Sequence, residues 1–267
     1  ARAFPLLREF DFPATVYQTT YYSLKQVPIF PLMCSYLLWL AKPQALLTDR
    51  LTDSTIDTHL EGPDSRAQVF WAVLRFARRH RLTDDAKQDL LATLAAELGI
   101  DYEALLRARV LQLMNPQEVG EISQAGIDVQ LHTHRHRSPG DEAAYRKELG
   151  TNRQLITQMT GRLPRHFCYP SGATKPEFAS WLRKEGVRSA TTCRAGLVST
   201  RNDRLALPRL LDHSGLSEVE FEAWLSGVGQ FVARRRAEPT VAPDSPAEQI
   251  QLLEQIPHFG ALTPSGG

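Results

Sequence analysis

The sequence predicts an α/β fold for the part of the chain beyond residue 114. Three observations support this prediction. Helix and strand patterns alternate from residue 115 onward, with clear start and stop signals. Residues 127–131 alternate apolar and polar side chains at the period of a half-buried strand. Polar and histidine-rich segments then follow strands, and in such folds the carboxyl ends of the strands meet in one pocket.

The first predicted helix of this part has a well-defined start. Asn115 can cap a helix that has Pro116 at its first position and Glu118 at its third, and Gly126 ends it. The strand at residues 127–131 comes directly afterwards. The remaining predicted elements are, in chain order, a helix from Asp141 to Gly161, a strand at 167–169, a helix from Pro176 to Gly186, and strands at 187–192 and 205–210.

The last predicted helix begins at Ser217, which forms a capping-box pattern with Glu220. We expect its Phe221, Trp224 and Leu225 to face the core.

Composition sets only broad limits. A chain of 267 residues with 42% hydrophobic content can bury a full core. The net charge is +1 and no basic stripe carries interleaved aromatic residues, so nucleic acid is not an expected partner. Cys34, Cys168 and Cys193 have no metal-binding spacing, and their odd number argues against a closed disulfide framework. Residues 231–267 are predicted to be a disordered tail.

The strongest chemical signal is the run from His132 to His136, directly after the predicted strand. If the chain turns after His132, the imidazoles of His132 and His136 converge, and neutral imidazoles suit a divalent ion such as zinc. His134 has the same parity and is the alternative to His136 as a ligand. A solvated basic loop is the competing interpretation.

Two ordered motifs resemble those of the polysaccharide deacetylases, carbohydrate esterase family four, whose catalytic part is called the NodB-homology domain. His132–His136 resembles the histidine motif His-Ser/Thr-x-x-His, and residues 165–172 resemble the next motif, Arg-x-Phe-x-Tyr-Pro-x-Gly. The resemblance covers residues 1–23 and about 115–228. It implies a distorted (β/α) barrel that removes N- or O-acetyl groups from carbohydrates with one divalent metal, most commonly zinc.

The resemblance also implies roles for individual residues. His132 and His136 would hold the metal, and the backbone N–H of Tyr169 would help to hold the oxyanion. Pro170 and Gly172 would shape the substrate-binding turn, while Arg165 would orient a catalytic base. His213 could be the general acid, or it could be an ordinary surface histidine.

The chain departs from the family pattern at its start. The family's Thr-Phe-Asp-Asp-Gly motif, which supplies the base and a metal-binding aspartate, is absent, and neither Asp11 nor Asp128 is placed like that pair. We interpret the chain as an amino-terminally truncated deacetylase with two metal ligands, weak or inactive as written. The sequence does not predict the cellular compartment of the protein, because an export signal would lie in the missing segment.

Residues 24–114 are predicted to be an all-helical insertion, with the barrel formed by residues 1–23 and 115–230. Its helices include the apolar stripe at 69–77 and segments capped by Thr83 and Asp101. The insertion is either a lid over a sugar cleft or a pad that covers the barrel. The apolar stretch 27–47 is too interrupted by proline and lysine for a membrane-spanning helix, although peripheral contact with a membrane or partner stays open.

Three other functions stay open. The chain could be a catalytically silent carbohydrate-binding relative or an allantoinase-like amidohydrolase of the same superfamily. It could also be an interaction module that docks through its helical insertion. An upstream Asp-Asp pair, metal dependence and binding by the insertion alone would distinguish these from the deacetylase.

Overall fold

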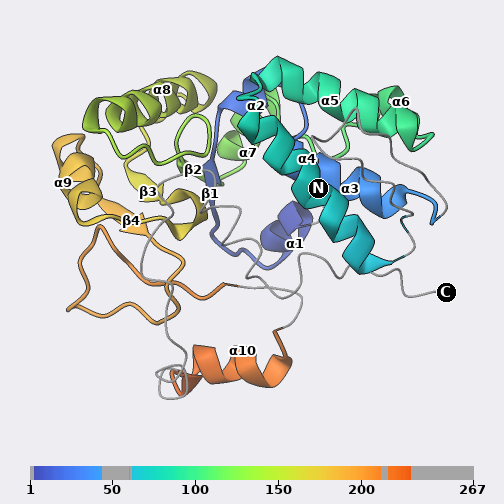
Figure 1. The fold of residues 1–267 in the computed structure, drawn as a ribbon. Coiled ribbons are helices and arrows are strands. Elements are labelled where there is room, and N and C mark those ends of the chain that lie inside the picture. The colour runs from blue at the N-terminus through green and yellow to red at the C-terminus, as the bar shows by residue number, and fades with distance from the viewer. Residues whose placement is uncertain (1–2, 44–59, 61, 212–215, 230–267) are drawn as a thin grey trace. The chain divides into compact units, whose positions relative to one another are not determined.

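A computed structural model describes residues 3–43, 60, 62–211 and 216–229 (Figure 1). The chain divides into two compact units. We call residues 1–24 and 114–245 the α/β unit. The described residues of 25–113 form the second unit, which we call the helical unit.

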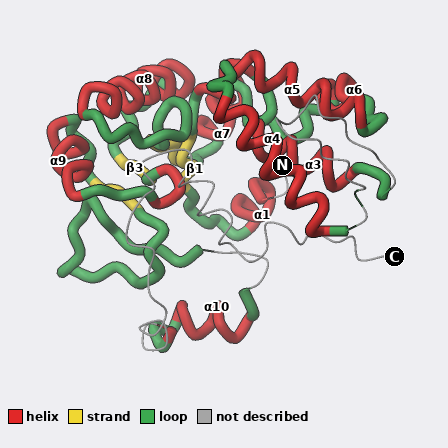
Figure 2. Tube along the Cα trace, viewed as in Figure 1, coloured by secondary structure: helices red, strands yellow, loops and turns green. Residues whose placement is uncertain are grey.

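The α/β unit alternates short strands with helices, as Figure 2 shows. This confirms the predicted α/β class. Its elements are α1 (Ala3–Glu9), β1 (Thr15–Gln18), α2 (Tyr21–Lys25), α7 (Pro116–Gln124), β2 (Asp128–Leu131), α8 (Glu142–Thr160), β3 (His166–Cys168), the 3-10 turn Pro170–Gly172, α9 (Pro176–Lys184), β4 (Ser189–Thr191) and α10 (Glu218–Leu225).

The four strands form one parallel sheet in the order β1-β2-β3-β4. Gln18 pairs with Leu131, Leu131 with Phe167, and Cys168 with Thr191. Because all strands run the same way, the residues that follow them lie at one edge, which we call the carboxyl edge. Closure of this sheet into a barrel is not seen among the described residues.

Local sequence signals explain where the helices begin and end. Asn115 and Glu118 form the predicted capping box, with each side chain accepting a hydrogen bond from the backbone N–H of the other residue. The Asp141 carboxylate accepts the N–H of Ala144 at the start of α8. At the end of α8, Gly161 has a φ of 70°, the left-handed conformation that favours glycine.

The core of the α/β unit lies between the sheet and its helices. α7 and α8 contact each other and β2 (Figure 1). Tyr145 of α8 and Phe178 of α9 stack with their ring centroids 4.7 Å apart, and both rings are buried. Fully buried side chains here include Val119, Leu131, Leu149, Ile156, Phe167 and Leu182. Burial of this apolar surface fixes which face of each helix meets the sheet.

Two sequence predictions are wrong in this unit. The strand expected at 205–210 is reduced to one parallel bridge between Thr191 and Leu207. Pro208 has no N–H to continue the ladder, which limits pairing there. α10 begins at its capping box as predicted, but none of its residues is buried, and Phe221 and Leu225 are 45% and 59% exposed.

The helical unit has a core of its own. Its helices are α3 (Phe30–Leu40), α4 (Pro63–Arg79), α5 (Asp84–Glu97) and α6 (Tyr102–Arg107). The predicted caps Thr83 and Asp101 accept backbone N–H groups at the starts of α5 and α6. Met33, Leu37, Val73, Leu91 and Leu94 are fully buried against one another. Within the described residues, no helix is long and apolar enough to cross a membrane. Part of the apolar stretch, residues 44–59, lies outside the described residues, as does the predicted tail from residue 231.

Candidate functional site

His132 follows β2 at the carboxyl edge and is held at two points. Its ring Nδ1 lies 2.7 Å from the carbonyl oxygen of Cys168, at the end of the neighbouring strand. A carbonyl oxygen only accepts hydrogen bonds, so Nδ1 carries the proton and Nε2 keeps its lone pair. Burial, together with the nearby His136, lowers the pKa of His132 to about 4. The ring is therefore neutral near pH 7, as a metal ligand must be.

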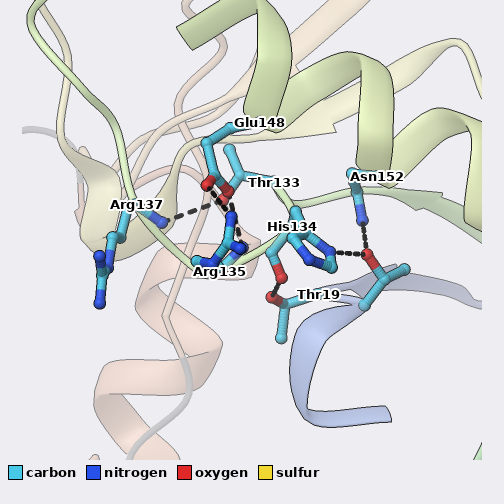
Figure 3. A network of polar contacts seen from close by, with 8 residues as sticks. Thr19, Thr133, His134, Arg135, Arg137, Glu148 and Asn152 are labelled. Carbon is cyan, nitrogen blue, oxygen red and sulfur yellow. Dashed lines mark hydrogen bonds and ion pairs between the residues drawn. The ribbon is translucent and has the colours of Figure 1, made fainter. Parts of the chain in front are cut away.

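The loop after His132 is fastened to helix α8 by two side chains one turn apart. Asn152 Oδ1 accepts the backbone N–H of His132 at 2.9 Å. Glu148 accepts the backbone N–H of Arg135 at 2.8 Å and forms an ion pair of 3.0 Å with its guanidinium (Figure 3). Thr133 and His136 have φ values of 60° and 55°, a costly conformation for residues other than glycine. The contacts with α8 stabilise this turn against its own strain.

His134 contacts the segment that follows β1. Its Nδ1 lies 2.9 Å from the Thr20 hydroxyl. Its carbonyl oxygen accepts a hydrogen bond from Thr19, as the close-up in Figure 3 shows. Its ring packs edge-on against Tyr21. His134 is buried, with 9% of its surface exposed, and burial lowers its pKa. These contacts tie the loop to the segment after β1.

The structure brings His132 and His136 together, as the spacing predicts. Their ring centroids lie 4.8 Å apart with the rings nearly perpendicular. His136 is exposed at the surface, and partial desolvation of its ring lowers its pKa. No group of three or more His, Cys, Asp or Glu residues within the described part of the chain is arranged to hold a metal. The two histidines therefore fit a metal as a partial ligand set.

Tyr169, Pro170 and Gly172 come directly after β3, whose last residue, Cys168, accepts the hydrogen bond from His132. In this structure the Tyr169 N–H donates to the carbonyl oxygen of Thr191 at 3.1 Å, so it is not free for an oxyanion. The Tyr169 hydroxyl donates to the carbonyl oxygen of Leu205, and its ring is buried in the core. The oxyanion role predicted for this N–H requires the hydrogen bond to Thr191 to be exchanged for one to substrate.

Gly172 closes the turn against the following strand. Its φ is 72°, and a Cβ added there would lie 2.6 Å from the Cβ of Cys193. Real Cβ atoms essentially never approach that closely, so both the conformation and the space require glycine. The close approach of Cys193 explains why glycine is needed for the shape of this turn.

Arg165 and Asp128 lie at the opposite edge of the sheet. Leu131 pairs with Phe167, so Arg165 is level with Val129, three positions before His132. Three strand residues span about 10 Å. The Arg165 side chain is exposed and forms no ion pair with a carboxylate of the described residues. This placement does not bring Arg165 to the histidines, so nothing here supports its predicted role in orienting a base. His213 lies outside the described residues.

The sequence reasoning missed Glu148 and Asn152. Both lie on the buried face of α8, between the apolar residues Tyr145, Leu149 and Ile156. Two polar residues four positions apart within an apolar helix stripe are a signal for a buried polar contact. That signal predicts hydrogen bonding but does not indicate which loop is the partner.

Residues 77–190 match the family model described as polysaccharide deacetylase. Together with the two motifs at the carboxyl edge, this match supports the assignment of the chain to the polysaccharide deacetylase family, the family of the NodB-homology domain. The matched range begins in α4, so it includes part of the helical unit, which the motif resemblance did not cover. No curated protein matches the chain.

Several solved structures are similar to parts of the chain. A polysaccharide deacetylase from Bacillus cereus is 19% identical, with 43% of this chain and 38% of that one covered and a TM-score of 0.38. A Streptococcus pyogenes deacetylase in complex with acetate is 16% identical, with coverage of 52% and 63% and a TM-score of 0.40. The deacetylase domain of BpsB from Bordetella bronchiseptica is 16% identical, with coverage of 78% and 64% and a TM-score of 0.42. The chain thus spans 38% to 64% of the lengths of these three.

Proposed function

We propose that the chain is the hydrolase of an acetylated carbohydrate, acting on the carbon-nitrogen bond of an N-acetyl group with a divalent metal, zinc first among the candidates. The single observation that best supports this is the state of His132. Its Nδ1–H is committed to the Cys168 carbonyl, which leaves Nε2 free beside His136. Metal-binding histidines characteristically donate their second ring N–H to a carbonyl or carboxylate in this way.

The two histidines are ligands of a type that zinc prefers, but there are fewer of them than a catalytic zinc site usually has. Two neutral imidazoles are typical zinc ligands, and a catalytic zinc usually has three protein ligands. His132 and His136 would hold the ion. When bound, it would lower the pKa of its water toward about 7 and polarise the acyl carbonyl.

The remaining residues of the site act by positioning. Asn152 holds the backbone of His132, and Glu148 holds that of Arg135, so the loop keeps its strained turn without a ligand. The turn at Pro170–Gly172 begins two residues after Cys168, whose carbonyl oxygen accepts the hydrogen bond from His132. A substrate acyl group bound between them would meet preorganised groups, which lowers the reorganisation needed in the transition state.

A second candidate function is a catalytically silent carbohydrate-binding relative. The absence of a three-residue ligand cluster among the described residues favours it. No observation specifically supports an allantoinase-like amidohydrolase. None supports contact with a membrane surface either.

The test is acetate release from chitooligosaccharides, measured with added zinc and again after chelation. Because the chain lacks the Asp-Asp motif, we expect slow zinc-dependent release that is abolished in the double variant His132→Gln/His136→Gln. Gln154→Leu, on the exposed face of α8, is the control and should keep the activity. Saturable sugar binding without acetate release would replace the hydrolase with the binding relative. Release that survives chelation and the double variant would exclude both the metal and this site.

A further inference from the structure

Arg209 lies at the carboxyl edge of the sheet, on the segment that follows the bridge between Thr191 and Leu207. Its backbone N–H donates to the carbonyl oxygen of Arg194 at 2.9 Å. One guanidinium nitrogen, Nη2, lies 3.3 Å from the sulfur of Cys193. The backbone and one arm of the guanidinium are therefore held in place.

The charge of Arg209 acts on groups from the other strands. Besides burial, the Arg209 charge contributes to the low pKa of His132 after β2. It opposes the upward shift that burial imposes on the pKa of Tyr17 in β1, and likewise on that of Cys168 in β3. Its position is given by its contact with Cys193, because Cys193 packs directly against Gly172. Arg209 therefore lies at the carboxyl edge, beside the turn Pro170–Gly172.

Arg209 lacks an anionic partner within the described residues. Its Nε is buried and makes no hydrogen bond there, and the printed ion pairs of the described carboxylates involve other cations. The polar neighbours that act on it are the thiols of Cys193 and Cys168, the Tyr17 phenol and the His132 imidazole, and none of them is a carboxylate. A guanidinium with a buried, unsatisfied N–H is costly unless a charged acceptor meets it.

We propose that Arg209 binds a monocarboxylate anion of the acetate class beside His132. Its free Nε–H and planar guanidinium suit the two oxygens of a carboxylate. The identity of the anion rests on the proposed function, because acetate is the product of deacetylation. Binding itself needs neither turnover nor metal, and it makes Arg209 a product-binding residue.

The most direct test observes Arg209 in the unaltered chain. Sodium acetate is titrated into nitrogen-15-labelled protein with EDTA present, and the Nε–H resonance of Arg209 is followed by NMR. We expect a saturable downfield shift with a dissociation constant in the millimolar range, typical of a ligand this small. Sodium chloride at equal ionic strength and neutral acetamide should not reproduce it. No shift, or the same shift with chloride, overturns the proposal.

Variants provide the second measurement. Arg209→Gln should weaken acetate binding at least tenfold, whereas Arg209→Lys should retain part of it. Arg188→Gln is the matched control, because it removes the same charge from an exposed residue just before β4, at the opposite edge. Equal acetate affinity in Arg209→Gln and Arg188→Gln overturns the proposal. Acetate binding that requires zinc and is unchanged by Arg209→Gln overturns it as well.

The two proposals fail in different ways. Acetate binding that depends on Arg209, in a protein that releases no acetate from sugars, would keep the carboxylate site and reject the hydrolase. Deacetylation with acetate affinity unaffected by Arg209→Gln would keep the hydrolase and reject this role of Arg209.

Discussion

Asn152 of α8 accepts the backbone N–H of His132 through Oδ1 at 2.9 Å. Its Nδ2 donates to the Gln18 carbonyl at 2.9 Å and to the Thr20 hydroxyl at 3.2 Å. This one fully buried amide therefore joins the ends of β1 and β2 to the helix between β2 and β3. The orientation of His132 depends on a residue twenty positions further along the chain.

Asn152→Leu should destabilise the chain by about 3 kcal/mol, because it leaves several buried polar groups without a partner. Urea denaturation followed by circular dichroism measures the free energy of unfolding. Gln154→Leu makes the same replacement of an amide on the exposed face of α8 and should change stability by about 0.5 kcal/mol or less. Similar values for the two variants would contradict a structural role for the Asn152 contacts.

Gly172→Ala should cost more stability than Gly161→Ala. Both glycines have φ near 70°, so each substitution incurs about 1 kcal/mol of backbone strain. Only at Gly172 does the new Cβ also meet Cys193, while nothing lies within 4 Å at Gly161. We expect a total of about 3 kcal/mol at Gly172, measured by thermal unfolding. If Gly161→Ala costs as much, the close approach to Cys193 does not constrain the turn.

His134→Gln and His136→Gln should affect different properties of the protein: the first its stability, the second its affinity for zinc. His136 stands beside His132, so its loss should weaken zinc binding at least tenfold in equilibrium dialysis with little change in stability. His134 is bonded to Thr20, so its loss should lower stability by about 1 kcal/mol and leave zinc affinity nearly unchanged. The reverse ranking would make His134 the ligand.

The low pKa of His132 predicts a pH dependence of stability in the metal-free chain. Burial lowers this pKa to about 4, whereas the unfolded chain binds the proton near pH 6.5. The stabilisation is therefore fully present above pH 6.5 and is lost as pH falls toward 4, by at most about 3 kcal/mol. His132→Gln should flatten the curve over this window. NMR titration gives the pKa directly, and a value near 6.5 would refute the prediction.

Much of the fold was predictable because its signals are local. The caps at Asn115, Thr83 and Asp141 and the left-handed Gly161 depend on residues within one turn of the helix end. The strand at 205–210 and the buried face of α10 could not be predicted in the same way. Both predictions required knowing which surface would cover the segment, and that depends on packing between distant parts of the chain.

The sequence by itself determined the α/β class and the approach of His132 to His136, and it carries the two motifs that resemble the polysaccharide deacetylases, because each of these depends on short-range spacing. Only the tertiary structure decided that His134 turns to Thr20 and that Glu148 and Asn152 hold the histidine loop. It also decided that Arg165 lies at the far edge and that Arg209 contacts Cys193, next to Gly172. The reason is physical: a parallel sheet brings together residues that follow different strands, and spacing along the chain carries no information about which of them meet.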